Sequence, residues 1–202
     1  PKDIQDWDDL VRDDVGVITP NPKTSGGARW NFLAAWAWAE REYDGDEPQV
    51  RDYIEGLYQN VLVLDSGARG ATTSFVENGQ GDVLITWENE GYLAMEEYPG
   101  EYEIITPSVS ILCQPTVAVV DEVTRVNGTT ELATEYLNYL YSNEAQHLAA
   151  EYYYRPSNQE ILAQYGDRFD LDVELATIDE FGGWAAAQEK FFSDGGVFGM
   201  IY

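Results

Sequence analysis

The chain is poor in basic residues. It has 11 Lys and Arg against 37 Asp and Glu, which gives a formal charge of −26 over 202 residues. Binding to nucleic acid depends on Lys and Arg contacts with phosphates, so this composition argues against nucleic acid as a partner. It disfavours an anionic membrane surface for the same reason. The acidic residues are spread along the chain rather than gathered in a tail, which is typical of a highly solvated surface.

Cysteine and histidine are almost absent. Cys113 is the single cysteine, which excludes an intramolecular disulfide and a cysteine-based metal cluster. His147 is the single histidine, and no hydrolase motif of Ser or Cys accompanies it, so we expect a structural or solvent-exposed side chain. The glycine-rich turns match neither the Walker pattern nor the dinucleotide fingerprint. We therefore expect no metal, no cofactor and no catalysis.

No apolar run reaches the length that a membrane span needs, so we expect no direct membrane insertion. The first residues lack an initiator methionine and the pattern of an export signal, which predicts a mature form or a fragment. Hydrophobic residues nevertheless make up 44% of the chain and aromatic residues 13%. This content is enough for a folded protein with one or two compact lobes.

Predicted strands and helices alternate along the chain. The expected strands are residues 15–19, 60–65, 82–87, 102–106 and 115–120, with a short one at 175–178. The expected helices include residues 4–11, 30–43, a stretch after Pro48, stretches opening near Ala68 and Glu88, and residues 130–141, 145–153 and 185–192. This order predicts an α/β architecture with a mostly parallel sheet, whose ligands bind outside the carboxyl ends of the strands.

Two small-residue turns open helices shortly after predicted strands. One contains Ser25, Gly26 and Gly27, and the other runs from Ser66 to Ala71 and includes Ala68. The first N–H groups of a helix have no intrahelical acceptor and lie at the positive end of its dipole, so such a turn suits an anion. Each turn alone is explained more simply by an N-cap serine and by glycines that relieve backbone strain. The repetition at one edge of the sheet favours the anion site.

Three further side chains lie near these turns in the sequence. Trp87 ends the third strand, where its indole N–H is available as a donor. A buried structural tryptophan is plausible in a chain with six of them, but the place of Trp87 at the third strand end favours the site. Arg29 and Arg69 each follow a turn directly. They either contact the anion or bond to backbone and acidic neighbours and so stiffen the loops, and we favour the stiffening role.

Longer stretches around these residues resemble the sulfate-binding proteins of ABC importers. The resemblance covers nearly the whole chain and is carried by residues 17–31, 63–70, 81–90, 154–156 and 181–184. It implies a type II periplasmic-binding-protein-like fold that closes on a dehydrated sulfate through hydrogen bonds, without a salt bridge or metal. Carried over by position, the donors are the hydroxyl of Ser25, the backbone N–H groups of Gly26, Gly27 and Ala68, and the indole of Trp87.

The resemblance also implies how the chain is divided. Residues 1–105 are expected to form the second lobe with the anion-binding turns, and residues 106–202 the hinge return and the C-terminal part of the first lobe. Family members begin with a further half-lobe, so one complete lobe and part of another are expected here. We accordingly expect weaker sulfate binding than in an intact relative, and self-association through an exposed sheet edge or cleft.

The function implied is capture of sulfate or thiosulfate for the membrane subunits of an ABC importer, in the periplasm or at the cell surface. The alternative is an anion-sensing effector domain of a transcription regulator, which can use the same fold and would need a DNA-binding helix-turn-helix. A phosphoryl- or sulfuryl-transfer enzyme is a third class. It would need a nucleophile, base or metal that the sequence does not identify.

Overall fold

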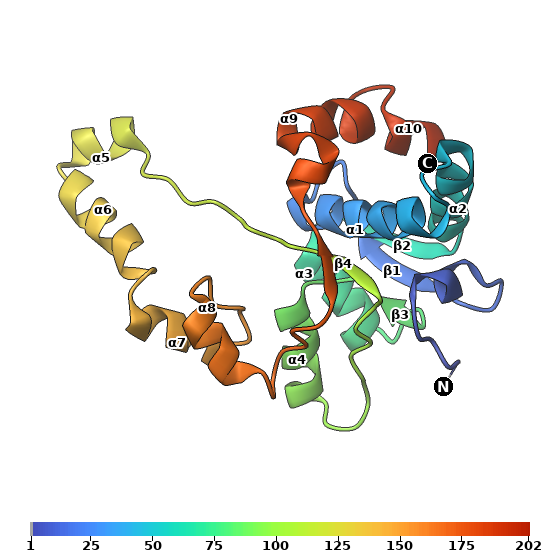
Figure 1. The fold of residues 1–202 in the computed structure, drawn as a ribbon, viewed down its shortest axis with the longest axis horizontal. Helices are drawn as coiled ribbons and strands as arrows, with labels where there is room; N and C mark the ends of the chain where they lie inside the picture. Colours follow the sequence, from blue (N-terminus) through green and yellow to red (C-terminus); the bar gives the residue numbers. More distant parts are fainter. Residues whose placement is uncertain (1) are drawn as a thin grey trace. The chain divides into compact units, whose positions relative to one another are not determined.

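The computed structural model describes residues 2–202, which divide into two compact units (Figure 1). The first unit runs to Cys113 and takes in the C-terminal residues 172–202, while the second unit is residues 114–171. The expected lobes, residues 1–105 and 106–202, are a different division from these compact units. The assignment of the two units to lobes stays a prediction.

A three-stranded parallel sheet lies at the centre of the first unit. Its strands are β1 (Val17–Pro20), β2 (Val61–Asp65) and β3 (Val83–Leu84), in the order β2-β1-β3. Strand β1 aligns Pro20 with Asp65 of β2, and Ile18 with Leu84 of β3. The three strands predicted first are confirmed, and so is the α/β class. Short apolar runs between helices are typical of such a sheet, because helices shield both of its faces.

Helices and a second, two-stranded parallel sheet complete the first unit. The helices that precede or separate the three strands are η1 (Trp7–Val11), α1 (Gly26–Glu42), α2 (Glu47–Gln59), α3 (Ala68–Thr72) and η2 (Thr73–Glu77). After β3 come α4 (Glu88–Glu97), β4 (Val109–Ile111), β5 (Glu174–Ala176), η4 (Ile178–Phe181), α9 (Gly183–Ala187), η5 (Gln188–Phe192) and α10 (Val197–Ile201). Strand β4 pairs with β5, which brings the C-terminal part of the chain back to residues 109–111.

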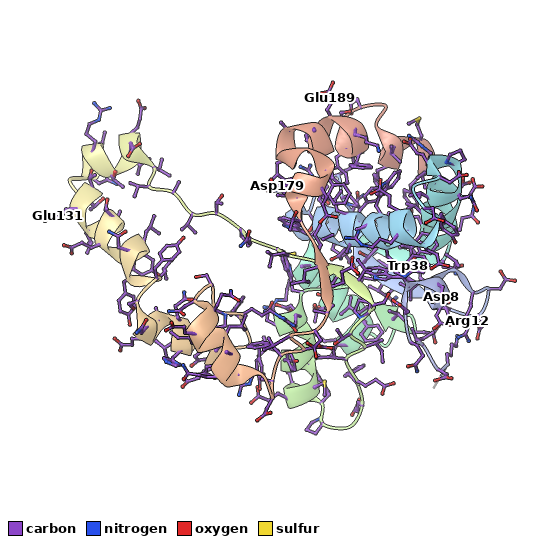
Figure 2. The ribbon with its side chains drawn as sticks, viewed as in Figure 1. Asp8, Arg12, Trp38, Glu131, Asp179 and Glu189 are labelled. Carbon is purple, nitrogen blue, oxygen red and sulfur yellow. The ribbon has the colours of Figure 1, made fainter. Side chains whose placement is uncertain are left out.

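Helix α1 forms the core of the first unit. It is apolar around most of its circumference, which is the pattern of a helix buried on all sides. Phe32 is 1% exposed and Trp36 fully buried, and their rings meet Phe191 of η5 at centroid distances of 5.5 and 4.8 Å. Figure 2 shows side chains crowded around α1, with Trp38 among them, whereas the labelled Asp8, Asp179 and Glu189 lie at the surface.

The connections between the strands explain where the helices lie. The chain leaves β1 through α1 and α2 to reach β2, then returns past β1 through α3 and η2 to reach β3. Right-handed crossovers in opposite directions place their helices on opposite faces of a sheet. The loops that leave β1 and β2 at their carboxyl ends therefore diverge, which is where ligands bind in open α/β sheets.

Two of the predicted strands are wrong. Residues 102–106 and 115–120 are without regular structure, and the strand in this part of the chain is Val109–Ile111. The side chains of Val117 and Val120 are 53% and 62% exposed. β-branched residues favour an extended backbone, but a strand also needs a partner to accept and donate its hydrogen bonds. The short strand expected at 175–178 is confirmed as β5, which begins one residue earlier and ends two residues earlier.

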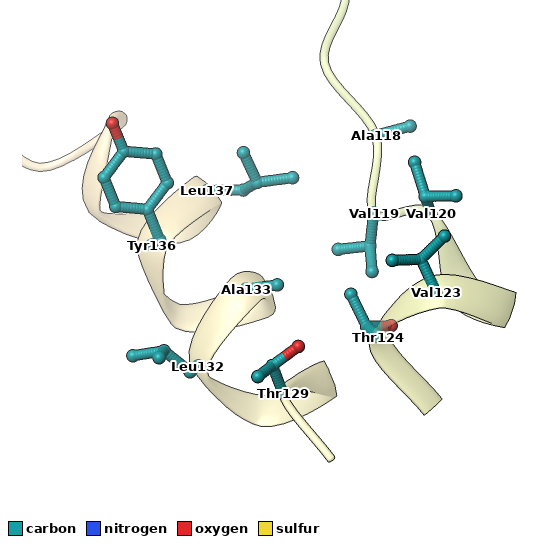
Figure 3. Close-up of a pocket in the computed structure, with 10 residues that line it drawn as sticks. All are labelled: Ala118, Val119, Val120, Val123, Thr124, Thr129, Leu132, Ala133, Tyr136 and Leu137. Atoms are coloured by element: carbon teal, nitrogen blue, oxygen red, sulfur yellow. The ribbon is translucent and has the colours of Figure 1, made fainter. Parts of the chain in front are cut away.

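The second unit is helical. Its elements are α5 (Asp121–Asn127), α6 (Thr130–Tyr139), α7 (Asn143–Glu151), α8 (Gln159–Leu162) and η3 (Ala163–Tyr165). Helices α5 and α6 and the segment before α5 line an open apolar hollow of about 590 Å³, whose walls include Val119, Val123 and Leu137 (Figure 3). His147 lies in α7, where its Nδ1 is 3.1 Å from the hydroxyl of Tyr165, so its side chain has a structural partner. No helix within residues 2–202 is long and apolar enough to span a bilayer.

Candidate anion-binding site

The first predicted turn opens helix α1 as the sequence indicated. Ser25 is the N-cap, with an extended backbone, and its Oγ accepts a hydrogen bond from the N–H of Ala28 at 3.3 Å. This bond uses a lone pair of the hydroxyl and leaves its hydrogen available. The N–H groups of Gly26 and Gly27 lie in the first helical turn, where no carbonyl of the helix can reach them. The turn therefore presents a hydroxyl and backbone N–H groups together.

Trp87 lies directly against this turn. A Cβ placed on Gly27 would come within 2.9 Å of the indole Nε1 of Trp87, closer than any side chain tolerates. Trp87 is the residue before α4, and it packs half-buried against the core of the first unit. The structure thus brings together two of the predicted site residues that are 60 positions apart in the sequence. Glycine at position 27 is needed because the indole occupies the space of a side chain.

The second predicted turn opens helix α3. Gly67 is its N-cap, and no side chain caps the helix, so the N–H groups that follow, including that of Ala68, lie at an uncapped helix start. The backbone N–H of Asn21, in the first loop, donates to the carbonyl of Asp65 at 2.8 Å. This bond joins the loop that leads to Ser25 to the strand end that leads to Ala68.

Arg29 contacts protein groups on two sides. Its Nε donates to the carbonyl of Pro22 at 2.9 Å, and its Nη1 donates to Oε1 of Gln188 at 2.7 Å. Its guanidinium also lies over the ring of Phe192, 5.4 Å from the centroid. These contacts tie the first turn to η5.

Arg69 is placed differently. Its side chain is 81% exposed, and its Nη2 lies 3.6 Å from Oε1 of Glu90, a carboxylate that is 14% exposed. Glu90 also accepts a hydrogen bond from Thr72 at 3.3 Å. A pair with one partner so exposed contributes little to stability, about 0–1 kcal/mol. The contact links the start of α3 to the start of α4.

Some polar groups near the strand ends were missed by the sequence analysis. The Nδ2 of Asn31 donates to Oγ1 of Thr19 and to the carbonyl of Ile85. Within residues 2–202, Oδ2 of Asp65 and Oγ1 of Thr86 are buried without a hydrogen-bond partner. A polar residue inside an apolar helical pattern, such as Asn31 between Trp30 and Phe32, is the signal that could have drawn attention to it.

The arrangement suits hydrogen bonding to an anion better than catalysis or metal binding. The described residues contain no group of three or more His, Cys, Asp or Glu side chains placed to hold a metal ion. The groups that converge around Ser25, Gly27 and Trp87 are a hydroxyl, backbone N–H groups and an indole N–H. All of them donate hydrogen bonds, and donors without a positive charge can hold an anion at a helix N-terminus.

Comparisons with known proteins agree with this chemistry. A model of the family described as bacterial extracellular solute-binding protein matches residues 1–155. The sulfate-binding protein of Escherichia coli K12 is 54% identical over 203 residues, an alignment that takes in 100% of this chain and 61% of that relative. The thiosulfate-binding protein of Pseudomonas aeruginosa is 45% identical, with the same two coverages. The chain thus spans about three fifths of the length of these curated relatives.

A solved structure is similar as well. The sulfate-binding protein SubI from Mycobacterium tuberculosis H37Rv superposes with a TM-score of 0.78 at 32% sequence identity. The match covers 96% of this chain and 65% of that one. The likeness in fold therefore extends over nearly all of the described residues.

Proposed function

This chain belongs to the family of bacterial extracellular solute-binding proteins, and from that premise we propose that it is the sulfate-binding component of an ABC importer. The observation that carries the proposal is the contact of the Trp87 indole with Gly27, beside the hydroxyl of Ser25. This contact gathers donors of three chemical kinds at one helix start. The relatives described above are named as sulfate- or thiosulfate-binding proteins. Both ions are tetrahedral dianions.

Hydrogen bonds alone account for useful affinity. Each hydrogen bond to a charged group contributes about 1.5–3 kcal/mol, so the donors of Ser25, Gly26, Gly27, Ala68 and Trp87 together exceed the ~8 kcal/mol of micromolar binding. The surplus is offset by desolvation of the ion and by ordering of the protein. In the proposed site the positive ends of the α1 and α3 dipoles would both favour the anion. A protein with a formal charge of −26 can therefore hold a dianion without a cationic ligand.

Selectivity against phosphate follows from the same donors. Hydrogen phosphate carries a proton at neutral pH, and its hydroxyl needs an acceptor. Four of the five proposed ligand groups can only donate, and the Ser25 hydroxyl already accepts the N–H of Ala28, so binding hydrogen phosphate would leave its hydroxyl poorly paired. Sites built on hydrogen bonding reject ligands that leave a polar group without a partner. Sulfate and thiosulfate carry no such proton.

Isothermal titration of sulfate, thiosulfate and phosphate at neutral pH tests the proposal. We expect sulfate to bind and phosphate to bind far more weakly. The 202-residue chain should be titrated beside a chain extended to its natural N-terminus, because we expect the longer chain to bind sulfate more tightly. Equal affinity for phosphate and sulfate would contradict the donor-only site.

Transport is favoured over regulation as the context of binding. The family is described as extracellular, so we propose a location in the periplasm or at the cell surface, and the membrane subunits of an importer as partners. None of the relatives named above is a transcription regulator. An upstream reading frame that encodes a helix-turn-helix domain instead of an export or lipoprotein signal would overturn this choice.

A further inference from the structure

The side-chain amide of Asn31 lies between the helix that opens the site and the chain segment that carries Trp87. Its Nδ2 donates to Oγ1 of Thr19 at 3.1 Å and to the carbonyl oxygen of Ile85 at 2.9 Å. Thr19 belongs to β1 and Ile85 directly follows β3, so one amide joins helix α1 to two adjacent strands. An asparagine amide nitrogen has two hydrogens, and these two acceptors use both of them.

Helical spacing couples this amide to the site. Asn31 follows Gly27 by four positions, so both residues lie on one face of α1, a single turn apart. At Gly27 that face meets the indole of Trp87, and at Asn31 it meets the carbonyl of Ile85. The helix therefore touches the segment from Ile85 to Trp87 at two points. One contact places the donor and the other fixes the backbone two residues before it.

The sheet itself does little to hold this segment. The aligned pairs between β1 and β3 end at Ile18 and Leu84, and the last ladder bond joins the N–H of Ile85 to the carbonyl of Ile18 at 3.0 Å. The carbonyl of Ile85 is bonded by Asn31 instead of by a strand. Oγ1 of Thr86, the residue between Ile85 and Trp87, has no partner among the described residues. The amide of Asn31 thus supplies a side-chain hydrogen bond that holds the strand end to α1.

We propose that Asn31 is a positioning residue that sets the distance between the indole N–H of Trp87 and the N–H groups of Gly26 and Gly27. This inference rests on the proposed function, because those groups are the donors proposed for sulfate. Asn31 does not touch the anion. It acts by fixing the strand end, so that donors from two elements meet at one place.

The chain offers a matched control. Asn60, at the C-cap of α2, is also half-buried, and its Nδ2 also donates to two acceptors, the carbonyls of Leu10 and Arg12, at 2.9 and 2.8 Å. Asn31→Ala and Asn60→Ala therefore remove the same number of hydrogen bonds from the first unit. Only the first removes a bond to the segment that carries Trp87. Thr19→Val is an intermediate variant, because it leaves the bond from Asn31 to Ile85 in place.

Two measurements on each variant decide the question. The first is the ¹H–¹⁵N resonance of the Trp87 indole, assigned with Trp87→Phe, in the 202-residue chain without ligand. The second is the sulfate affinity by titration calorimetry, in the same chain and in one extended to its natural N-terminus. We expect Asn31→Ala to shift the indole resonance and to lower the sulfate affinity by about tenfold or more. We expect Asn60→Ala to leave the resonance in place and to change the affinity by no more than about twofold. Thr19→Val should fall between them.

The two proposals can fail separately. An unchanged Trp87 resonance in folded Asn31→Ala, or an affinity loss no greater than in Asn60→Ala, would overturn the positioning role. Absence of sulfate binding by the extended unaltered chain would overturn the proposed function, and the indole resonance would still decide whether Asn31 positions Trp87. If Asn31→Ala does not fold, Asn31→Ser removes the same donors with a smaller change in polarity, and the same two outcomes apply.

Discussion

At the scale of single residues, Ser25 is an N-cap and is also proposed as an anion ligand. Its oxygen accepts the N–H of Ala28 and so caps α1, while its hydrogen stays free to donate. The sequence offered the cap and the anion ligand as competing explanations. A hydroxyl has both a donor and acceptors, so the structural and binding roles are compatible. The two roles can be separated by changing the charge at this position and keeping the cap.

We predict that Ser25→Asp keeps the fold and abolishes sulfate binding. Aspartate is as good an N-cap as serine, but its carboxylate repels a dianion and has no hydrogen to donate. Ser25→Ala should lose about 0.5–2 kcal/mol of stability and weaken binding less than the aspartate does. Urea denaturation and sulfate titration of both variants provide the measurements.

Ser142 serves as the control for the capping effect. It caps α7 in the second unit, where its side chain accepts from the N–H of Ala145 at 3.2 Å. Ser142→Ala should therefore cost similar stability and leave the sulfate affinity unchanged. Sulfate binding by Ser25→Asp at the affinity of the unaltered chain would show that Ser25 is only a cap.

Cys113 is predicted to be inert in the folded protein. Burial raises the pKa of its thiol to about 12, so the reactive thiolate is scarce at about pH 8. We expect a disulfide reagent such as DTNB to modify Cys113 slowly in the native state and rapidly in denaturant at the same pH. Fast native-state reaction would mean that the backbone around Cys113 opens readily.

At the scale of elements, local signals predicted the structure where a residue itself determines the backbone. Ser25 is the N-cap of α1 and Pro48 lies in the first turn of α2. These two residues predicted where the two helices start. The strands at 102–106 and 115–120 failed because pairing depends on a partner elsewhere in the chain. Val109 pairs with Glu174, and no local pattern carries that information. The contact of Gly27 with Trp87 is non-local in the same way, and it was predicted through the family resemblance.

The start of β3 is predicted to be acid-sensitive. Asp82 is bonded by Lys2 and accepts the N–H of Gly16 at 2.8 Å, which joins β3 to the start of β1. The bond from Lys2, with a smaller part from Gly16, holds the pKa of Asp82 below its ordinary value of 3.8, although desolvation opposes this. A lowered folded-state pKa means that the stabilisation is complete above the ordinary value and is lost as the pH falls through the lowered one.

We therefore expect Asp82→Asn to reduce the free energy of unfolding at neutral pH and to have no effect below the lowered pKa. Its side chain is 33% exposed, so the loss should be modest, about 1 kcal/mol or less. Urea denaturation at several pH values measures this. Asp13→Asn, at an exposed carboxylate, makes the same charge change and should show a smaller pH-dependent difference. An equal pH dependence in both variants would argue that net charge, and not the bonds from Lys2 and Gly16, is responsible.

At the scale of the whole molecule, the family and the α/β class were within reach of the sequence, and the fold of solute-binding proteins is confirmed over part of its relatives' length. The return of residues 172–202 to the first unit is a feature that local sequence patterns did not indicate. Residues 172–202 return to the first unit through β5 and through η5, whose Phe191 packs on Trp36. That return depends on packing between distant segments, since Trp36 and Phe191 are 155 positions apart and the paired Val109 and Glu174 are 65 apart. No periodicity in either segment reveals it.

The second unit carries unusual apolar exposure for its size. Val126, Leu132 and Val120 are 82%, 68% and 62% exposed, and the last two line the hollow between α5 and α6 (Figure 3). Apolar surface gathered in this way favours association, whereas scattered apolar residues do not. The formal charge of −26 opposes it, because copies of the chain repel one another. Salt shortens the range of that repulsion to about 3 Å at 1 M and leaves apolar contacts intact.

We predict that the 202-residue chain self-associates with rising concentration, and more strongly at 1 M than at 0.05 M NaCl, where the Debye length is several times longer. Light scattering after size exclusion gives the mass at each condition. Leu132→Glu should shift the chain toward the monomer, since it places a charge in the hollow. Leu62→Glu is the control, because Leu62 is 61% exposed on the edge strand β2 of the other unit. If Leu62→Glu alone abolishes association, the sheet edge drives it. A monomer at high concentration and high salt would contradict association through either the hollow or the sheet edge.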